Sequence, residues 1–300
     1  MTKGNSLINL GDLSKPATVL VEKISDAIGG YYKPYQIKRV AKAEAEAEII
    51  KAQAQIEVTD LQRRALIRFV AEEARRQENI EQITKRAFPL IEDTAKPENM
   101  ENDWVANFFD KCRIVSDEEM QSLWARVLAG EANAPGTYSR RTVNFLSSLD
   151  RADAELFTSL CGFVCFCGTV IPLVFDVQHS IYNSHGINFS TLSHLDDIGL
   201  VSFDNIAGFK RTKVAKVAVM VYYGTVLTIE FQNEVDNDLE IGKVLLTKTG
   251  QQLADICGST EVAGFQSYII ERLAAKGLLL SSPYPRVVVP NTEHIISPER

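Results

Sequence analysis

Three of the five cysteines lie close together, and they are the residues of this sequence with the most evident capacity for metal chemistry. Cys161, Cys165 and Cys167 are followed by His179, and thiolate and imidazole groups are common zinc ligands. Their spacing does not match that of a recognised zinc site. We therefore predict no metal and interpret these cysteines as small buried side chains.

The cysteine count also indicates a cellular compartment. An odd number of cysteines in 300 residues is not typical of a secreted disulfide framework. The first twenty residues contain no long apolar stretch behind a basic start, as a signal peptide would. We expect a reducing environment and a cytoplasmic location.

Carboxylates that could bind a metal ion are frequent between residues 103 and 131, but no histidine lies among them. Helix capping explains part of this cluster, because Ser116 and Glu119 have the spacing of a capping box. We therefore predict a helix that begins after Ser116 and no metal site. The acidic residues are Asp103, Asp110, Asp117, Glu118, Glu119 and Glu131.

The sequence lacks the motifs of common catalytic sites, namely GxxxxGK[ST], GxGxxG, HExxH and GxSxG. Glu230 lies in a predicted strand, but Gln232 stands where a restriction-type nuclease would carry a lysine. The four histidines are scattered and have no evident nucleophile beside them; they are His179, His185, His194 and His294. We predict a non-enzymatic protein without a cofactor.

A long N-terminal arm is the first element that would position a functional surface. Residues 36–96 consist largely of strong helix formers and contain no glycine. Apolar and small residues recur there at intervals of three and four, which is typical of a coiled coil. Such a helix buries too little to be stable alone, so we predict a homo-oligomer, with folding back on the same chain as the alternative. The predicted seam consists of Val40, Ala43, Ala47, Ile50, Ala54, Val58, Leu61 and Ala65.

Two apolar segments raise membrane contact as an alternative that we do not favour. Residues 1–35 include an amphipathic helix over 16–28, followed by a connector, but few basic residues accompany it. Residues 156–175 carry no charge and are long enough to span a bilayer. Pro172 and the absence of basic anchors favour a buried helix that turns into a strand near Val170.

Residues 97–175 are predicted to form a helical domain with a motif core of Trp104, Phe108, Trp124 and Leu128. From Asp103 to Phe157 the chain resembles the domain-of-unknown-function 2806 family, an uncharacterised bacterial family with a similar Ala/Glu-rich arm. It is more loosely similar to the alpha-type abortive-infection proteins, through the WARVLA segment that begins at Trp124. The resemblance covers about residues 16–200. It implies a bacterial or prophage origin and a setting in phage defence, and it brings no catalytic residues.

Residues 176–285 change to the periodicity of strands. Ser190 is predicted to cap a helix that ends at Gly199, and β-branched runs on either side of Gly224 predict a hairpin. Residues 244–246 would add a third strand. This order is similar to a winged-helix module, and residues 286–300 form a tail.

A winged helix provides the alternative of a DNA-binding regulator. The basic residues that could contact nucleic acid are Lys210, Arg211, Lys213 and Lys216. Against this function, the net charge is −7, and acids outnumber bases from residue 97 onward.

The fold class that we predict is mainly α with a smaller α+β part: a long coiled-coil-like helix, a helical middle domain and a winged-helix-like end. We expect a self-assembling protein that acts as a sensor, scaffold or effector through protein contacts. A protein or a phage-derived trigger is the expected partner.

Overall fold

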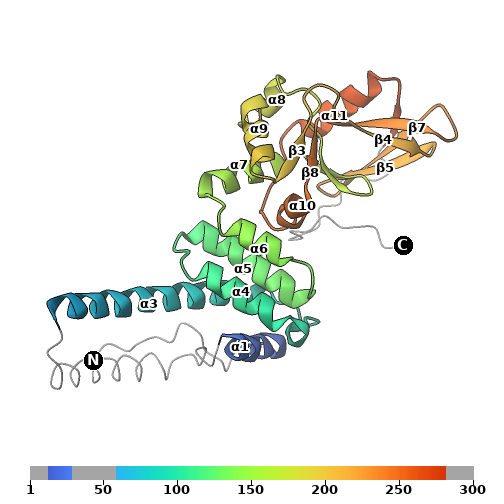
Figure 1. Ribbon diagram of the computed structural model, residues 1–300. Coiled ribbons are helices and arrows are strands. Elements are labelled where there is room, and N and C mark those ends of the chain that lie inside the picture. The colour runs from blue at the N-terminus through green and yellow to red at the C-terminus, as the bar shows by residue number, and fades with distance from the viewer. Residues whose placement is uncertain (1–12, 29–58, 282–300) are drawn as a thin grey trace. The chain divides into compact units, whose positions relative to one another are not determined.

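The computed structural model describes residues 13–28 and 59–281, and the chain divides into two compact units (Figure 1). The division falls between Ser148 and Leu149 and not at residue 175, where we had predicted a boundary. The reason is a long-range pairing: strand β1 (Val164–Phe166) pairs with β5 (Val217–Tyr222). Residues 149–175 therefore belong to the second unit.

The described part of the first unit is helical. It comprises α1 (Lys15–Ala27), α3 (Asp60–Ala87), α4 (Asn102–Cys112), α5 (Glu118–Asn133) and α6 (Arg140–Leu146), with short 3-10 helices η2 (Phe88–Leu90) and η3 (Pro97–Asn99). The helix predicted over 16–28 is confirmed as α1, which begins after the N-cap Ser14. Its apolar side packs against α4 and η3. That side is therefore not available to bind a membrane. The buried residues of α1 are Ala17, Leu20, Val21 and Ile24.

The prediction of one continuous helix over 36–96 was wrong, because the backbone at Thr59 is not helical (φ −55°, ψ 150°). The Thr59 hydroxyl accepts a hydrogen bond from the Gln62 backbone nitrogen at 3.3 Å, and the Gln62 side chain accepts one from the Thr59 nitrogen at 3.0 Å. This reciprocal capping box starts a new helix at Asp60. The predicted seam therefore does not lie on a single helix.

Aromatic side chains of α4 and α5 form the core of the first unit. The rings of Trp104 and Phe108 are stacked with centroids 5.1 Å apart, and Phe108 meets Trp124 edge-on at the same distance. The indole nitrogen of Trp104 donates a hydrogen bond to the Tyr138 carbonyl at 2.6 Å. Leu128 is also buried. The four predicted motif-core residues are thus packing residues that hold this unit together.

The described part of the second unit combines helices with small antiparallel sheets. Its helices are α7 (Arg151–Cys161), α8 (Ser180–Asn183), α9 (Phe189–Asp197), α10 (Lys248–Ala254) and α11 (Phe265–Ala274). Its other strands are β2 (Val170–Pro172), β3 (Val201–Phe203), β4 (Phe209–Val214), β6 (Thr225–Glu230), β7 (Asn237–Gly242), β8 (Val244–Leu246) and β9 (Leu279–Ser281). The order β2-β1-β5-β6-β9 forms a five-stranded sheet, while β3 pairs with β8 and β4 with β7.

The hairpin predicted around Gly224 is confirmed as β5 and β6, with Val217 opposite Glu230 and Tyr222 opposite Thr225. Gly224 has φ 79°, a left-handed conformation that suits glycine in a tight turn. The third strand predicted over residues 244–246 is confirmed as β8, but it pairs with β3 in a separate sheet and does not extend the hairpin. The strands that flank the hairpin are instead β1 and β9, which lie far away in the sequence.

The uncharged segment 156–175 is a helix followed by a strand pair. α7 ends at Cys161, after which β1 and β2 pair with Cys165 opposite Ile171. The strand predicted near Val170 is confirmed, but the helix before it is short. Within residues 13–28 and 59–281 no helix combines the length and the apolar character needed to cross a membrane.

The helix predicted to begin after Ser190 starts two residues earlier. The N-cap of α9 is Asn188, whose side-chain oxygen accepts a hydrogen bond from the Thr191 nitrogen at 3.2 Å, and the Thr191 hydroxyl returns a contact to the Asn188 nitrogen. Asparagine competes well with serine at this position, and here its spacing to Thr191 completes a capping box.

Candidate functional site

Helix α3 is the element that presents the most distinctive surface in the first unit, because its two halves have different environments. The C-terminal half packs against α4 and α5. Its buried residues are Asn79, Ile80, Ile83, Thr84 and Ala87. Figure 1 shows the N-terminal half of α3 extending beyond α4 and α5. We call residues 60–75 the α3 arm.

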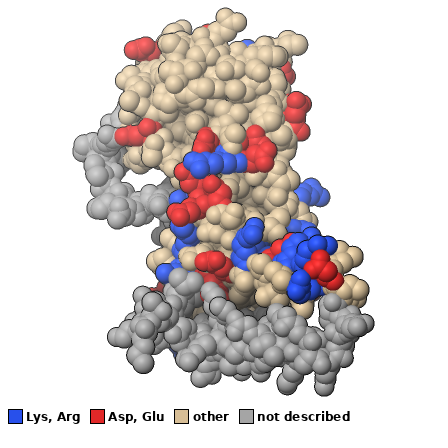
Figure 2. Space-filling view, turned by 90° about the vertical axis from the view of Figure 1, so that its left-hand side faces the viewer, with Lys and Arg blue, Asp and Glu red and all other residues tan. Residues whose placement is uncertain are grey.

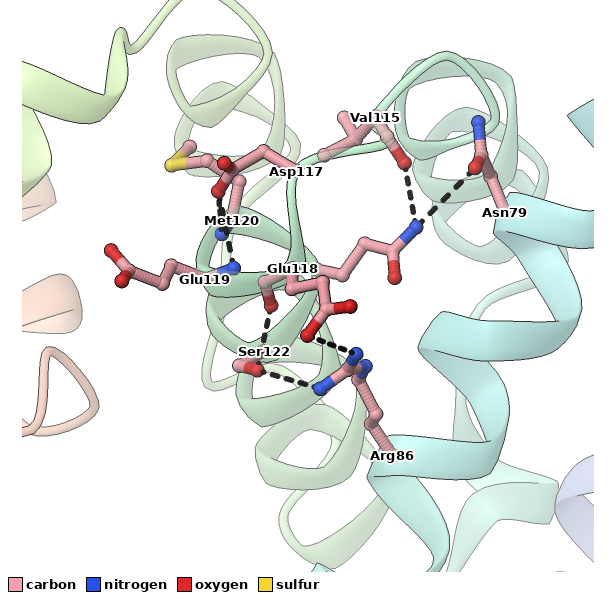
Figure 3. Close-up of polar contacts among 9 residues, drawn as sticks. Asn79, Arg86, Val115, Asp117, Glu118, Glu119, Met120 and Ser122 are labelled. Atoms are coloured by element: carbon pink, nitrogen blue, oxygen red, sulfur yellow. Dashed lines mark hydrogen bonds and ion pairs between the residues drawn. The ribbon is translucent and has the colours of Figure 1, made fainter.

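Polar contacts fix the C-terminal half of α3 on α5 (Figure 3). The Gln121 side-chain nitrogen donates to Asn79 Oδ1 at 3.3 Å and to the Val115 carbonyl at 2.9 Å. Asn79 in turn donates to the Arg113 carbonyl at 2.9 Å. These buried amides have partners, which makes the α3–α5 interface specific in register as well as apolar.

A second contact of the same interface lies closer to its surface. Arg86 donates a hydrogen bond to Ser122 Oγ at 3.3 Å and lies 3.6 Å from the Glu118 carboxylate (Figure 3). Glu118 is largely exposed, so this ion pair adds little free energy. Together with the Ser122 contact it joins the end of α3 to the first turns of α5.

The helix cap that we predicted at Ser116 belongs to Asp117. The Asp117 carboxylate accepts hydrogen bonds from the backbone nitrogens of Glu119 at 3.1 Å and Met120 at 2.9 Å (Figure 3). Glu119 lies in the first helical turn and is not the capping-box partner of Ser116. Asp117 is a better N-cap than Ser116, because its negative charge is stabilised by the two free backbone N–H groups and by the positive end of the helix.

The α3 arm exposes large apolar side chains. Leu61 is 69% exposed, and Ile67 and Phe69 are each 59% exposed. Leu66 and Val70 are also exposed, and on an α-helix they share one side with Ile67. Exposed apolar groups at such spacing are unusual on a free surface and typical of a contact surface.

The predicted seam residues fall partly on this arm. Leu61 and Ala65 lie on α3 and are exposed. The other six positions lie outside the described residues: Val40, Ala43, Ala47, Ile50, Ala54 and Val58. Sequence reasoning missed Leu66, Ile67, Phe69 and Val70, because the seam was followed through Thr59 in one fixed register. The Thr-Asp-Leu-Gln capping signal could have revealed that a helix begins at Asp60.

Charges of both signs accompany these apolar residues on the α3 arm. Asp60 lies 2.7 Å from Arg63 and 2.8 Å from Arg64, and Arg68 lies 3.7 Å from Glu72. In the space-filling view, basic side chains lie among acidic ones and do not form a large patch of one sign (Figure 2). The arm therefore carries no strong field that would repel an identical helix.

The acidic residues considered as metal ligands are dispersed over α4, α5 and the turns beside them. Asp110 pairs with Arg113 at 2.9 Å, and Asp117 caps α5. Glu131 is buried and accepts hydrogen bonds from the nitrogens of Gly136 at 2.7 Å and Tyr138 at 2.8 Å. Among the residues that the structure describes, no three potential metal ligands come together.

The cysteines and His179 also have separate environments. Cys165 and Cys167 are buried at and beside β1, and burial raises the pKa of the Cys165 thiol. His179 caps α8 and lies with its ring 4.5 Å from that of Tyr268. The fifth cysteine, Cys257, follows α10 and contacts Cys161, a proximity that the sequence did not indicate.

Three of the four basic residues considered for nucleic-acid contact have protein partners. Lys210 lies 2.6 Å from Asp238, and Lys216 lies 2.7 Å from Glu234. Arg211 donates a hydrogen bond to the Cys167 carbonyl, which turns its guanidinium toward the protein. Lys213 lies at an irregularity of β4 with φ 55°. Paired charges of this kind make a weak phosphate-binding surface.

These observations define an α+β protein with a helical unit, a projecting helix and an antiparallel β-unit. The chain belongs to the family described as "Protein of unknown function (DUF2806)", whose model matches residues 63–270. The resemblance noted from the sequence is thereby confirmed for this family. No curated protein and no solved structure matched the chain.

Proposed function

We propose that this protein is a non-enzymatic assembly protein whose chains associate through the α3 arm. The observation that carries this proposal is the exposure of Leu66, Ile67, Phe69 and Val70 on a helix whose other half is firmly packed. The contrast matters, because a helix anchored at one end presents its exposed side in a fixed orientation. A fixed apolar surface loses less conformational entropy on association than a mobile one.

The occupant that we propose is the same arm of a second copy. The order of residues along the arm is nearly symmetric about Arg68. In an antiparallel pair centred there, Leu66 would lie opposite Val70 of the second chain, and Ile67 opposite Phe69. Arg63 would lie opposite Glu73, so the outer positions would attract each other. A coiled-coil contact of this kind would also produce the self-association that the heptad pattern predicts.

The biological setting that we propose is anti-phage defence, in which the assembly serves as a sensor, scaffold or effector. The support for this setting is the looser sequence similarity to alpha-type abortive-infection proteins. The acidic C-terminal part of the chain would then remain available for a protein partner or a phage-derived trigger. Growth of phage-challenged cells with and without the gene tests this setting separately from assembly.

The assembly itself is tested by measuring the mass of the full chain in solution by light scattering at micromolar concentration. We expect an oligomer, and we expect the double variant Leu66→Glu/Val70→Glu to shift it to monomer. Ile114→Glu is the matched control, because Ile114 is a similarly exposed apolar residue of the same unit outside the α3 arm. A monomeric wild-type chain would contradict the proposal.

The orientation has its own charge-reversal test. Arg63→Glu alone and Glu73→Arg alone should each weaken association, because each places like charges opposite one another. The double variant Arg63→Glu/Glu73→Arg should restore it. An oligomer that resists the apolar double variant and all three charge variants would place the contact elsewhere on the chain.

A further inference from the structure

In the second unit, two segments that are distant in sequence lie side by side. One is the end of α7 with Gly162, and the other is the loop between α10 and α11, residues 255–264. The Tyr222 hydroxyl joins them, since it donates a hydrogen bond to the Gly162 carbonyl at 2.9 Å and accepts one from the Val262 nitrogen at 2.7 Å. The two segments are therefore held at a fixed separation.

The neighbouring Tyr223 and a threonine add to this link. The Tyr223 hydroxyl lies 2.8 Å from Ser259 Oγ and 3.3 Å from the Cys161 carbonyl oxygen. Thr158, one turn before Cys161, places its hydroxyl 3.4 Å from the Cys257 carbonyl oxygen. These contacts fix the backbone on both sides of the two cysteines.

The side chains of Cys161 and Cys257 meet between these segments. The two thiols are side-chain partners of one another, and the Cys257 thiol also donates a hydrogen bond to the Ala254 carbonyl at 3.3 Å. Cys161 is 1% exposed, whereas Cys257 is the one cysteine of the five that is not fully buried. Cys257 is therefore the member of the pair that is nearer to solvent, and Cys161 is buried beside it.

The surroundings of the pair give the two thiols different reactivity. The hydrogen bond from Cys161, with further ones from the Ser259 nitrogen and hydroxyl, lowers the pKa of Cys257 to about 7, although burial opposes this effect. Burial raises the pKa of Cys161. Because the thiolate is the reactive form, Cys257 is the better nucleophile of the two at neutral pH.

We propose that Cys257 and Cys161 form a reactive dithiol that is oxidised by low-molecular-weight disulfides of the glutathione class. In the first step the Cys257 thiolate attacks one sulfur of oxidised glutathione. A bond forms between Cys257 and that glutathione sulfur, the disulfide bond of the reagent breaks, and one glutathione leaves as a thiolate that takes up the proton released by Cys257.

In the second step Cys161 loses its proton to solvent and its sulfur attacks the Cys257 sulfur. The mixed disulfide breaks, the second glutathione leaves and is protonated, and a bond between Cys161 and Cys257 remains. Two protein thiols have then been oxidised and one glutathione disulfide has been reduced to two thiols. The product would tie the end of α7 covalently to the loop after α10, which the tyrosine contacts already hold in place.

The test treats the full chain with oxidised glutathione and follows its mass, with peptide mapping under non-reducing conditions. We expect the wild-type chain to lose two hydrogens and to yield one cross-linked peptide pair that contains Cys161 and Cys257. Dithiothreitol should reverse the change. A stable glutathione adduct, a different cysteine pair or no reaction would each overturn the proposal, and this measurement needs no variant that could fail to fold.

Two variants assign the order of the steps. Cys161→Ala should stop at a glutathione adduct on Cys257, whereas Cys257→Ala should abolish the reaction. Cys165→Ala is the matched control, because Cys165 is also a buried cysteine of this unit, and it should react like the wild-type chain. The rate of adduct formation in Cys161→Ala should be half-maximal at a pH above that of the wild-type chain, since alanine removes the donor to the Cys257 thiolate. An equal pH profile would show that Cys161 does not activate Cys257.

Discussion

The hydroxyl of Tyr222 accepts a hydrogen bond from the backbone nitrogen of Val262 at a distance of 2.7 Å, across forty positions of the sequence. Both residues are buried, and the ring of Tyr222 also packs edge-on against Phe265, with centroids 5.3 Å apart. A strand of the central sheet thereby determines where the loop before α11 lies. Burial raises the pKa of Tyr222, which keeps its hydroxyl protonated and able to donate to Gly162.

Tyr222→Phe should destabilise the protein by about 1–3 kcal/mol, because it leaves the buried Val262 nitrogen and the Gly162 carbonyl without this partner. Urea unfolding followed by circular dichroism measures the change, since both tryptophans lie in the first unit and would not report on this one. Val217→Ala on the exposed side of the same strand is the control and should change stability by less than about 0.5 kcal/mol. Equal costs for the two variants would show that the hydroxyl bridge contributes nothing.

The cap of α5 gives a second prediction. Asp117→Ala should lower the free energy of unfolding by about 1 kcal/mol, because the backbone nitrogens of Glu119 and Met120 lose their acceptor. Thermal unfolding measured by circular dichroism at 222 nm is suitable for this comparison. Ser116→Ala provides the control, since the side chain of Ser116 does not cap the helix. If Ser116→Ala were less stable than Asp117→Ala, the N-cap of α5 would be Ser116.

Glu131 gives a prediction about pH. Burial raises its pKa above the ordinary value near 4.5, although the Gly136 and Tyr138 nitrogens act in the opposite direction. The folded chain therefore holds this proton to a higher pH than the unfolded chain does. Stability due to Glu131 is fully present below the unfolded pKa and is lost as pH rises through the folded pKa.

Urea unfolding of the wild-type chain and Glu131→Gln over a pH series tests this sign. The difference in unfolding free energy, wild type minus variant, should fall as the pH rises from about 4.5, because only the wild type loses the proton. A difference that grows with pH would mean that the two backbone hydrogen bonds outweigh burial and hold the pKa of Glu131 below its ordinary value.

Local signals predicted much of this structure correctly. The β-branched runs around Gly224 gave the hairpin, and the apolar spacing over 16–28 gave the helix α1. Both features depend on residues a few positions apart. The apolar spacing of Trp104, Phe108 and Trp124 likewise identified buried positions, because helix periodicity alone decides which side faces a core.

The features that could not be predicted depend on distant partners or on competition between similar signals. Nothing in Val164–Phe166 or its neighbours encodes pairing with β5, and this pairing moved the boundary between the units. At Thr59, a capping box sets the start of a helix within a long run of strong helix formers. The contact between Cys161 and Cys257 likewise needed the Tyr222 and Tyr223 links, which join residues far apart in the sequence.

The two halves of α3 give the last prediction, because their apolar residues should contribute to stability in different ways. Ile83 is fully buried against the helical unit, so Ile83→Ala should cost about 2–5 kcal/mol at any protein concentration. Phe69 is exposed on the α3 arm, so Phe69→Ala should cost little in a dilute monomeric sample.

If chains associate through the arm, the cost of Phe69→Ala must grow with protein concentration, since only the native state binds a second copy and association stabilises it by mass action. Unfolding curves of wild type, Phe69→Ala and Ile83→Ala over a hundredfold range of concentration separate the two effects. The midpoint for wild type and for Ile83→Ala should rise in parallel, while that for Phe69→Ala should rise less. Three parallel responses would show that Phe69 lies outside any contact between chains, and three flat ones would show that folding is not linked to association.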